Sequence, residues 1–523
     1  MSAPETAAPE TAAPEIAAPE IAAPEIAAPE TSALETTAPE GAEHLTPEAP
    51  GTAPHDAPVA AQLVEFMAGR WAPVPPSPTP AVAAAPFHGR RRELLSARFP
   101  GDWIVVPTGH PKVRANDTDY RFRPGTDFAW LTGHYGPGAV LVLAPQPEGG
   151  HAATLYTTPR SDRSTPGFFS DRVNGELWVG PRPGLEEISA ALGIKAAPID
   201  DLATALKAAE AAVVRTVRGF DAGLDAEIAV TTPGADDDLL AVLAELRLVK
   251  DDHEIACLQA AVDATTLGFE DVVRALPEAG RHSERWVEGT FNRRARTEGN
   301  DVGYDTIAAC GHHACTLHWI RNDGPVRSGD LLLLDAGVEG LELYTADVTR
   351  TLPVGGRFSP AQREVYDTVW RAQQAGIAEC RPGNDFRAPH RAAVRVVTEW
   401  LVAKGIVTTT VDEAMDEAHP WHVRYTLHGV SHMLGLDVHD CANTRNGYRD
   451  HELRPGMVLT VEPGCYLQPD DLTVPEEFRG IGVRIEDDVV ITEDGCRVLS
   501  AALPTEASAV EAWMAPLLAA GNP

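Results

Sequence analysis

Five side chains of the kinds that bind metal ions are spread between residues 335 and 486, each inside its own short motif. In chain order they are Asp335 in LLLLDAG, Asp347 in YTADVTRT, His432 in HGVSHMLGLDVHD, Glu462 in LTVEPGCY and Glu486 in GIGVRIEDD. A carboxylate in a buried strand is costly unless it has a partner. Four carboxylates and one imidazole form a hard, anionic ligand set that suits two divalent cations held close together. We therefore expect a fold that brings these distant segments together around a two-metal hydrolase site.

Length and charge limit the classes of protein to consider. The chain has 523 residues, enough for two or three domains, and its hydrophobic content of 44% allows a sizeable core. A net charge of −33 argues against nucleic-acid binding, which normally uses a basic surface. This charge does not imply a cationic partner, because a solvated acidic surface explains it equally well.

The cysteines and the apolar runs predict a location. The seven cysteines are scattered and form no CxxC pair, which is typical of reduced intracellular thiols rather than of a disulfide framework. No run of 18 or more apolar residues is present, so we expect no membrane-spanning helix and no membrane partner. The N-terminus lacks the cationic start and apolar run of a secretory signal. A cytoplasmic protein is the expectation.

Composition divides the chain into four parts. Residues 1–86 are predicted to be a disordered acidic tail followed by a proline-rich linker. An Ala-Ala-Pro-Glu unit recurs there every five residues, and such regular prolines forbid a continuous helix. Residues 87–240 alternate strand-like and helical runs, as in an α/β domain. Residues 241–510 hold all five ligand-type residues, and 511–523 are predicted to be a C-terminal tail.

Several elements are predicted from periodicity before the ligand region. The strands are expected at 103–106, 139–143 and 153–158, the helices at 184–194 and 201–213, and a long amphipathic segment at 236–276 in two helical pieces broken near Lys250–Asp252.

The two aspartates are predicted to lie side by side across a hairpin formed by segments 329–340 and 341–354. Asp347 and Thr349 share one strand face by the two-residue period, and Asp335 ends the preceding strand. Neighbouring carboxylates repel each other unless a cation or a proton lies between them. On this pair alone, aspartates at strand ends explain the pattern as well as a metal site does.

Three histidines lie within thirteen positions in segment 428–440. Its two glycines disfavour a helix, so we expect a loop followed by a strand at LDVHD. One histidine is usually a core residue, but three are too dense for that explanation. His432 is the preferred ligand, with His428 and His439 as hydrogen-bonding or proton-transfer groups. His318 is a weak signal alone, but beside metal ions it is a candidate to hold a substrate carbonyl or amide nitrogen.

The two glutamates are predicted to lie inside strands. Glu462 is expected in the middle of a continuous apolar strand over 454–467 and is followed at once by a Pro-Gly turn, while Glu486 shares a strand face with Arg484 and Asp488. A structural ion pair with Arg484 explains Glu486 taken alone. Only its combination with the other carboxylates makes a metal site the better interpretation. The chain has no GxSxG, GxxxxGK[ST] or HExxH motif that would favour another catalytic class.

Together, these motifs resemble the pita-bread metallopeptidases, most closely the aminopeptidase P family. The order DAG, ADVTRT, HGxSH, VEPG and VRIEDD matches the five ligand blocks of that family. FRPGTDFAWLTG at 122–133 and ELWVGPRPG at 176–184 are similar to its N-terminal domain. The resemblance implies an α/β (α+β) fold class, in which an N-terminal creatinase-like α/β domain precedes a C-terminal pita-bread catalytic domain.

The resemblance also implies a role for each ligand-type residue. Asp335 would bind one metal ion, His432 and Glu462 mainly the other, and Asp347 and Glu486 would bridge them. The family uses two Mn²⁺ ions with a bridging water or hydroxide, and Co²⁺ or Zn²⁺ are possible replacements. Glu462 is implied as a proton shuttle as well as a ligand.

Further positions match active-site residues of the family. His318, His428 and His439 match histidines that contact the substrate and stabilise the tetrahedral intermediate, and Tyr466 and Arg484 match additional active-site positions.

Three matches are less direct. Arg449 aligns with a substrate-binding arginine only when counted back from RPGM, because the loop before it differs in length by one residue. Arg182 and Asp127 match N-terminal positions that help to close the site across subunits. The family also implies a homo-oligomer, either a dimer or a tetramer.

The implied activity is hydrolysis of the N-terminal Xaa-Pro bond of peptides by a metal-activated water. A prolidase, which cleaves Xaa-Pro dipeptides, has the same ligands, but Ser431 and the short loop between His439 and Pro455 favour an aminopeptidase P. A binding module that has lost its metals is disfavoured, because all five ligands and His318 are present.

Overall fold

The computed structural model describes residues 60–72, 81–209, 212–230, 232–445 and 447–521. The predicted repeat tail and most of the proline-rich linker lie outside these residues. The chain forms two compact units, 1–69 and 70–523, and helix α1 (Ala61–Ala68) is the described part of the first. A disordered tail was the wrong prediction for these eight residues, since AQLVEFMA contains no proline and consists largely of good helix formers.

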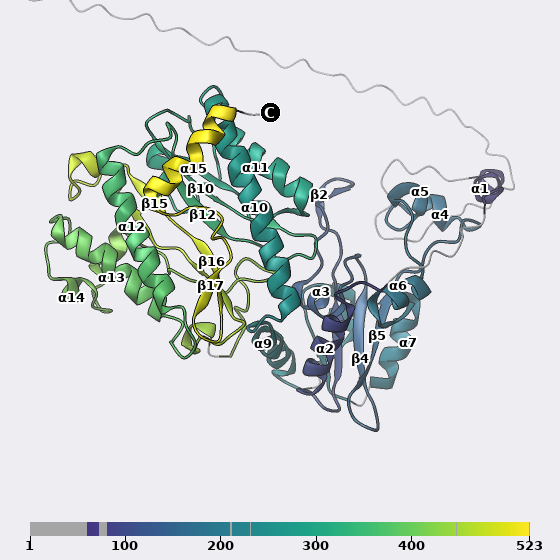
Figure 1. The fold of residues 1–523 in the computed structure, drawn as a ribbon. Helices are drawn as coiled ribbons and strands as arrows, with labels where there is room; N and C mark the ends of the chain where they lie inside the picture. Colours follow the sequence, from purple (N-terminus) through teal and green to yellow (C-terminus); the bar gives the residue numbers. More distant parts are fainter. Residues whose placement is uncertain (1–59, 73–80, 210–211, 231, 446, 522–523) are drawn as a thin grey trace, which may run out of the picture. The chain divides into compact units, whose positions relative to one another are not determined.

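The first folded region of the second unit contains a mixed five-stranded sheet (Figure 1). In sheet order its strands are β6 (Lys195–Pro198), β5 (His151–Thr157), β4 (Val140–Pro145), β1 (Trp103–Pro107) and β7 (Val214–Thr216). Its helices are α2 (Ala85–Ser96), α3 (Thr126–Thr132), α4 (Gly167–Ser170), α5 (Glu176–Val179), α6 (Leu185–Leu192), α7 (Leu202–Leu206), α8 (Ala222–Glu227) and α9 (Ala235–Arg247), and a small ribbon pairs β2 (Val113–Ala115) with β3 (Thr118–Asp119).

Both faces of this sheet are buried, because alternate strand residues enter different cores. Ile104 and Val106 of β1 contact the side of the sheet covered by α2, α3 and α9. Val105, between them, joins the cluster that includes Leu202 of α7 and Leu224 of α8. A strand buried on both faces reads as a continuous apolar run, as β1 and β4 do.

His88 on α2 is a buried histidine whose charge state links pH to stability. It is 4% exposed, and its Nδ1 donates to the Trp130 carbonyl at 2.8 Å. Burial lowers the pKa of His88 to about 4, more than this hydrogen bond raises it. The lowered pKa gives stability that is present above the unfolded pKa of about 6.5 and is lost as the pH falls from there toward 4.

We therefore expect wild-type protein to lose about 2 kcal/mol more unfolding free energy than His88→Gln between pH 7 and pH 5, on the basis of this shift. Urea unfolding of both proteins at the two pH values measures the difference. His419→Gln is the control, because the His419 side chain is 78% exposed and this variant should follow wild type. Equal losses in wild type and His88→Gln would show that His88 does not control this pH dependence.

The second folded region holds the predicted ligands in short sheets flanked by helices. The sheets are β12-β10-β9, β13-β16-β17, β14-β15 and β11-β8. The strands are β8 (Asp301–Val302), β9 (Ile307–Cys310), β10 (Leu331–Ala336), β11 (Val338–Glu339), β12 (Val348–Pro353), β13 (Val458–Val461), β14 (Gly464–Tyr466), β15 (Gly482–Arg484), β16 (Asp487–Ile491) and β17 (Cys496–Val498). The helices are α10 (Asp252–Ala279), α11 (Glu284–Glu298), α12 (Pro360–Glu379), α13 (Ala388–Ala403), α14 (Val411–Ala414) and α15 (Ala507–Ala520).

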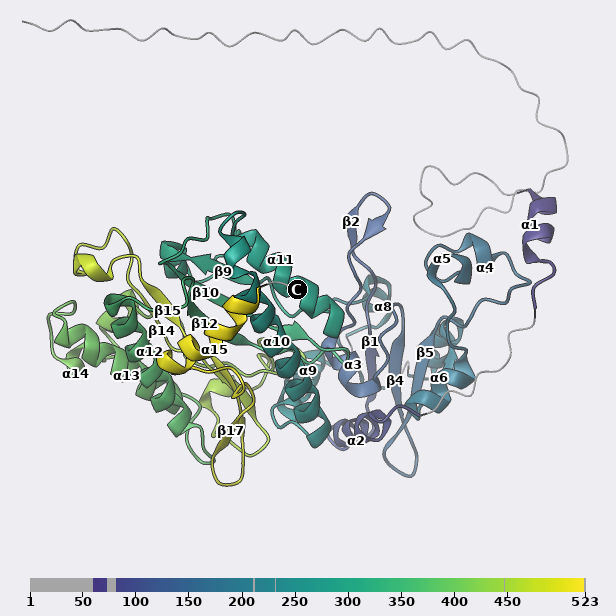
Figure 2. The same ribbon diagram turned by 45° about the horizontal axis from the view of Figure 1, so that its top comes forward.

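Helices cover these sheets on two sides. The strands of this region lie between α12 and α10 in both ribbon views (Figures 1 and 2). One continuous hydrophobic cluster includes residues of α10, α12, α13 and α15 together with β10, β12 and β13. No helix within the described ranges is both long and apolar enough to cross a membrane.

The predicted break between two helices near residue 250 is confirmed. α9 ends at Arg247 and α10 begins at Asp252. Asp251 caps α10, since its side chain accepts from the Glu254 N–H at 2.9 Å while the Glu254 side chain accepts from the Asp251 N–H at 3.0 Å. This reciprocal capping box explains why the helix starts there.

Two helix limits differ from the predictions. The helix expected over 201–213 ends at Leu206, because the chain must turn back to pair β7 with β1 from Val214. The predicted C-terminal tail overlaps α15, whose Val510 and Met514 are buried in the core. The division predicted at residue 240 also falls inside α9.

Three strand predictions were wrong in detail. LDVHD forms no strand, because the Gly435 N–H bonds the Asp437 carbonyl and turns the chain. The strand expected over 454–467 is interrupted at Glu462 and Pro463, between β13 and β14, and proline cannot donate to a sheet ladder. The strand expected over 480–492 is interrupted after Arg484, between β15 and β16.

Candidate metal centre

Asp335 and Asp347 meet as predicted, at the ends of two paired strands. In the β10–β12 ladder, Asp335 lies opposite Thr349, and the last pair is Ala336 with Val348. Asp347 comes directly before Val348 in the chain, just outside the ladder. The Tyr304 hydroxyl oxygen lies 2.7 Å from Asp335 Oδ1 and 2.6 Å from Asp347 Oδ1, so the two carboxylates share its single proton. Both aspartates are buried.

The interruption of two neighbouring strands places the two glutamates. Val461 pairs with Asp487 on one side of the gap, and Gly464 pairs with Arg484 on the other. Glu462 and Glu486 fall opposite each other inside this gap, where neither has to continue a ladder. Both strands lose their pairing at the same position, so the side chains of Glu462 and Glu486 are free to turn toward the aspartates.

Glu486 is held by the β12 strand. Its Oε2 accepts from Thr349 Oγ1 at 2.6 Å, and its N–H donates to the Thr349 carbonyl at 3.1 Å. Arg484 makes its ion pair with Asp335 at 2.5 Å and contacts Thr349 at 3.3 Å. The alternative in which Glu486 simply pairs with Arg484 therefore fails on geometry.

The Nε2 atom of His432 faces the carboxylates. Its Nδ1 donates to the Met433 carbonyl at 3.2 Å, which leaves Nε2 3.3 Å from Asp347 Oδ2 and 3.5 Å from Glu462 Oε1. A histidine that binds a metal commonly donates its other ring N–H to a backbone carbonyl in this way.

The segment that carries His432 is anchored at the break between α9 and α10. Asp440 is 1% exposed and pairs with Arg247 at 3.2 Å and with Lys250 at 3.7 Å. Burial opposes ionisation of Asp440, but these two cations lower its pKa. The same Arg247 also binds Asp127, so this residue has a partner within its own chain.

The ligand atoms of Asp347, His432 and Glu486 all lie within 4.8 Å of one another. Burial, followed by repulsion from neighbouring carboxylates, raises the pKa of Glu486 well above its usual range. Burial also raises the pKa of Asp335 and brings that of Glu462 to about 7. Burial alone would lower the pKa of His432, but Asp347 and Glu462 raise it to about 9.

This donor set fits a pair of divalent cations. The raised pKa values show that the buried carboxylates lack positive charge when no cation is present, despite the ion pair of Arg484. The buried Asp488 Oδ1, two residues after Glu486, has no hydrogen-bond partner. Carboxylate oxygens with one imidazole form a ligand set for hard or borderline divalent ions.

A chain of hydrogen bonds runs from Arg484 through Tyr466 to His428. Arg484 Nη1 donates to the Tyr466 hydroxyl at 2.9 Å, and that hydroxyl lies 2.7 Å from His428 Nε2. His428 Nδ1 donates to the Gly429 carbonyl, so Nε2 accepts the Tyr466 proton. Burial lowers the pKa of His428 to about 4, and the ring is neutral at pH 7.

The other predicted histidines lie around this cluster. The rings of His439 and His432 are 4.3 Å apart at 81°. Burial, followed by His432, lowers the pKa of His439, and His318 acts on it in the same direction. His318 is exposed and likewise lowers the pKa of His428, so it lies near both rings.

The two remaining arginines are less directly connected. Arg449 is exposed. After burial, it is among the groups that lower the pKa of His390. His390 Nδ1 accepts from the N–H of Val430, two residues before His432, at 3.3 Å. Arg182 donates to Asn174 at 2.9 Å and to the Thr158 carbonyl at 3.3 Å, within its own domain. No described contact connects Arg182 to the carboxylate cluster.

Sequence reasoning missed two residues that orient the ligands. Tyr304 lies in the turn between β8 and β9, more than thirty residues from Asp335 and outside the five ligand motifs. Thr349 was placed on the face of Asp347, but its bonds to Glu486 and Arg484 needed the structure. The two-residue period was the available signal for Thr349, whereas Tyr304 gave none.

Comparison with known proteins identifies the same two regions. The model of the aminopeptidase P N-terminal domain matches residues 87–216, and that of metallopeptidase family M24 matches 256–493. Xaa-Pro aminopeptidase 1 of Streptomyces coelicolor is 52% identical over 493 residues, covering 91% of this chain and 99% of that protein. The Xaa-Pro aminopeptidase of Escherichia coli is 34% identical over 455 residues, covering 82% and 97%.

Solved structures agree. The aminopeptidase PepP of Pseudomonas aeruginosa matches with a TM-score of 0.74 at 32% identity, over 84% of this chain and 99% of that one. A zinc-substituted Escherichia coli aminopeptidase P in complex with product matches with a TM-score of 0.73 at the same identity and coverage. These matches confirm the predicted fold class of an N-terminal α/β domain followed by a pita-bread domain. The chain belongs to the aminopeptidase P family, within metallopeptidase family M24.

Proposed function

We propose that this protein is a metallo-aminopeptidase that hydrolyses the N-terminal Xaa-Pro bond of peptides. The observation that carries the proposal is the convergence of four carboxylates, three of them buried, and His432 from five separated segments. The named relatives are Xaa-Pro aminopeptidases over nearly their whole length, which favours this activity over that of a dipeptidase. A complete ligand set argues against a metal-free binding module.

Asp335, Asp347, His432, Glu462 and Glu486 would hold two divalent cations, for which we propose Mn²⁺. When bound, such a pair lowers the pKa of a shared water from about 15.7 toward neutrality and polarises a carbonyl. Asp347 and Glu486 lie centrally in the cluster and suit bridging positions. Tyr304 and Thr349 fix the orientation of three of these carboxylates through the hydrogen bonds described above.

The neighbouring side chains would handle protons and the peptide. Glu462 is the least buried of the four carboxylates and lies 3.5 Å from His432 Nε2, so it suits a group that takes a proton from water and returns it to the leaving nitrogen. His439 and His318 lie beside the cluster and would contact the substrate. Both ring nitrogens of His428 are engaged, so we assign it to orienting Tyr466, with Arg449 at the edge of the site.

Proline at the second position would be favoured because its imide nitrogen carries no hydrogen that needs an acceptor. We also propose a cytoplasmic location, supported by seven unpaired thiols. Exposed Trp178 and its apolar neighbours Leu177 and Val179 support a homo-oligomer, which we propose to be a dimer or a tetramer. The boundary between the two domains is best placed at the break between α9 and α10.

Activity on the tripeptide Arg-Pro-Pro tests the proposal. We expect release of arginine by the purified protein, loss of activity after chelation, and recovery when Mn²⁺ is restored. The dipeptide Arg-Pro should be a much poorer substrate. Preference for the dipeptide would identify a prolidase instead. Unchanged activity after complete metal removal, verified by elemental analysis, would contradict the metal-dependent mechanism.

A further inference from the structure

A second group of metal-binding side chains lies outside the carboxylate cluster, where α10 meets the loop before β12. His253 and Cys257 are four residues apart near the start of α10, so they lie on one helix face. Glu342 comes from the loop between β11 and β12 and approaches that face. The three ligand atoms lie within 4.8 Å of one another.

We propose that His253, Cys257 and Glu342 form an additional metal site that binds Zn²⁺. Thiolate, imidazole and carboxylate are the three side-chain groups that zinc prefers, and a site with three protein ligands leaves the fourth position to water. The main centre contains four carboxylates and an imidazole but no thiol. The thiol of Cys257 therefore distinguishes this site chemically.

The distances between the groups already approach those of a zinc site. Cys257 Sγ lies 3.6 Å from His253 Nε2. Tetrahedral zinc with usual bond lengths separates a sulfur and a nitrogen ligand by about 3.5 Å. His253 Nε2 and Glu342 Oε2 are 2.6 Å apart, and they would have to separate to about 3.4 Å. The Glu342 side chain is 39% exposed and has room for this movement.

The charges at the site would balance on binding. One Zn²⁺ with one thiolate, one carboxylate and a neutral imidazole is neutral overall, which suits a partly buried position. Arg91 is a cation that acts on Cys257, and it is already paired with Asp251 at 2.8 Å and with Glu254 at 3.6 Å. Because these carboxylates offset its charge, Arg91 should repel a cation bound at this site only weakly.

A nucleophilic role for Cys257 fits less well. Burial, followed by Glu342, raises the pKa of the Cys257 thiol to about 12, so almost no thiolate exists at neutral pH without a cation. A zinc ion displaces that proton directly, because the coordinating sulfur is the thiolate. Phe87 stacks on the His253 ring at 5.0 Å and holds it beside Cys257.

Binding here would connect α10 to the loop that leads into the main centre. Glu342 lies five residues before Asp347, inside a turn that the Gly340 N–H closes by donating to the Tyr344 carbonyl at 2.9 Å. The ion would therefore fix the approach to one of the candidate bridging ligands without contacting substrate.

Cobalt binding to the full-length protein tests this site independently of activity. We expect wild type equilibrated with Co²⁺ to bind three ions per chain and to show a thiolate-to-cobalt absorption band in the near ultraviolet. Cys257→Ala should bind two ions and lose the band. Cys496→Ser is the control, because the thiol of this partly buried cysteine donates to the Ile377 carbonyl, and the variant should keep both signals.

Glu342→Gln is a second variant, at a partly exposed loop position, that should fold normally. It should weaken binding of the third ion at least about tenfold, and competition with Zn²⁺ should remove the cobalt band in wild type. None of the five residues of the main centre is a thiol, so the band reports on the second site alone. Its absence from wild type, or its persistence in Cys257→Ala, would overturn the proposal.

Discussion

Glu486→Gln is expected to lower kcat/KM for Arg-Pro-Pro by at least about a thousandfold. A bridging carboxylate contributes several kcal/mol to holding and charging a metal pair, and each 1.36 kcal/mol corresponds to a factor of ten. Glu486 is 1% exposed and its ligand atom lies within 4.8 Å of those of Asp347 and His432. The amide keeps the shape and the bond to Thr349 but removes the charge. Steady-state kinetics with metal analysis of the same samples measures both losses.

The same variant should make the metal-free protein more stable. The pKa of Glu486 is raised in the folded state, so its contribution to stability is present below its unfolded pKa, near 4.5, and is lost as the pH rises. At pH 8, the metal-free wild type must therefore either bury a charged Glu486 or keep Glu486 protonated above its ordinary pKa, and both cost free energy of unfolding. Removing that charge should raise Tm of the chelated protein at pH 8 and change it much less at pH 5.

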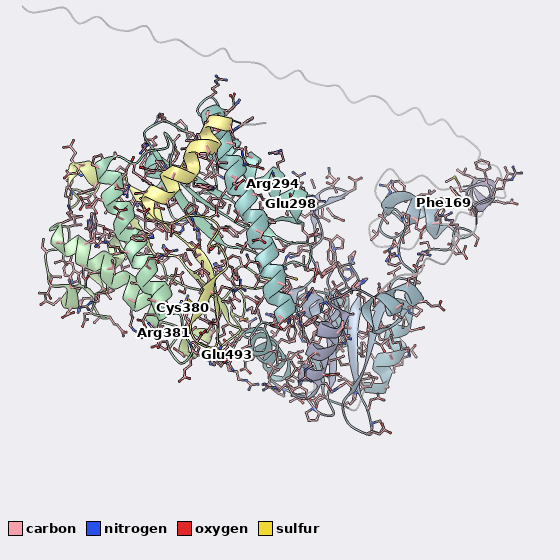
Figure 3. All side chains as sticks on the ribbon, in the orientation of Figure 1. Phe169, Arg294, Glu298, Cys380, Arg381 and Glu493 are labelled. Carbon is pink, nitrogen blue, oxygen red and sulfur yellow. The ribbon has the colours of Figure 1, made fainter. Side chains whose placement is uncertain are left out.

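Glu493→Gln provides the control for both effects. Glu493 is exposed, in the turn between β16 and β17, and is labelled in Figure 3. This variant should keep wild-type activity and metal content. If Glu486→Gln retained two metal ions and near-normal kcat/KM, its assignment as a bridging ligand would be wrong. A lower Tm of the chelated variant would contradict the electrostatic argument separately.

The sequence could predict which residues meet, but only part of how they meet. A carboxylate in a strand-like segment signals a partner, and four such residues with His432, in one order, predicted the cluster and the family. Asp335 and Asp347 were also placed correctly, because hairpin pairing follows from a two-residue period. The predicted strands around Glu462 and Glu486 were too long, because the apolar pattern of both segments is continuous.

The missing information concerns long-range pairing. Whether a ladder breaks at Glu462 depends on which strand lies beside it, and β16 is almost thirty residues away in the chain. Tyr304 illustrates the same limit, since a tyrosine in a turn has no periodicity to betray its role. The His253, Cys257 and Glu342 group likewise emerges only when α10 and the loop before β12 are placed together. Local patterns identified the ligands of the main centre, whereas tertiary contacts identified the residues that orient them and the second group.

Arg484→Met is expected to destabilise the metal-free protein by about 3–5 kcal/mol, the usual cost of removing one partner from a buried ion pair. Arg484 is 3% exposed and pairs with Asp335 at 2.5 Å. Methionine fills a similar space but leaves Asp335 without its cation and Tyr466 without its donor. Chemical unfolding of chelated wild type and variant measures the difference, with Arg497→Met on the exposed surface of β17 as the control.

Metal ions and pH should both reduce this loss, for one reason. Removing Arg484 raises the pKa of Asp335 further, so the stability that Asp335 contributes when protonated is lost as the pH rises. The variant should therefore be closer to wild type at pH 6 than at pH 8. Two bound divalent cations supply the missing positive charge, so the difference should also shrink when Mn²⁺ is added. A loss that is equal at both pH values and unaffected by Mn²⁺ would mean that Arg484 acts through packing rather than by neutralising the carboxylates of the metal centre.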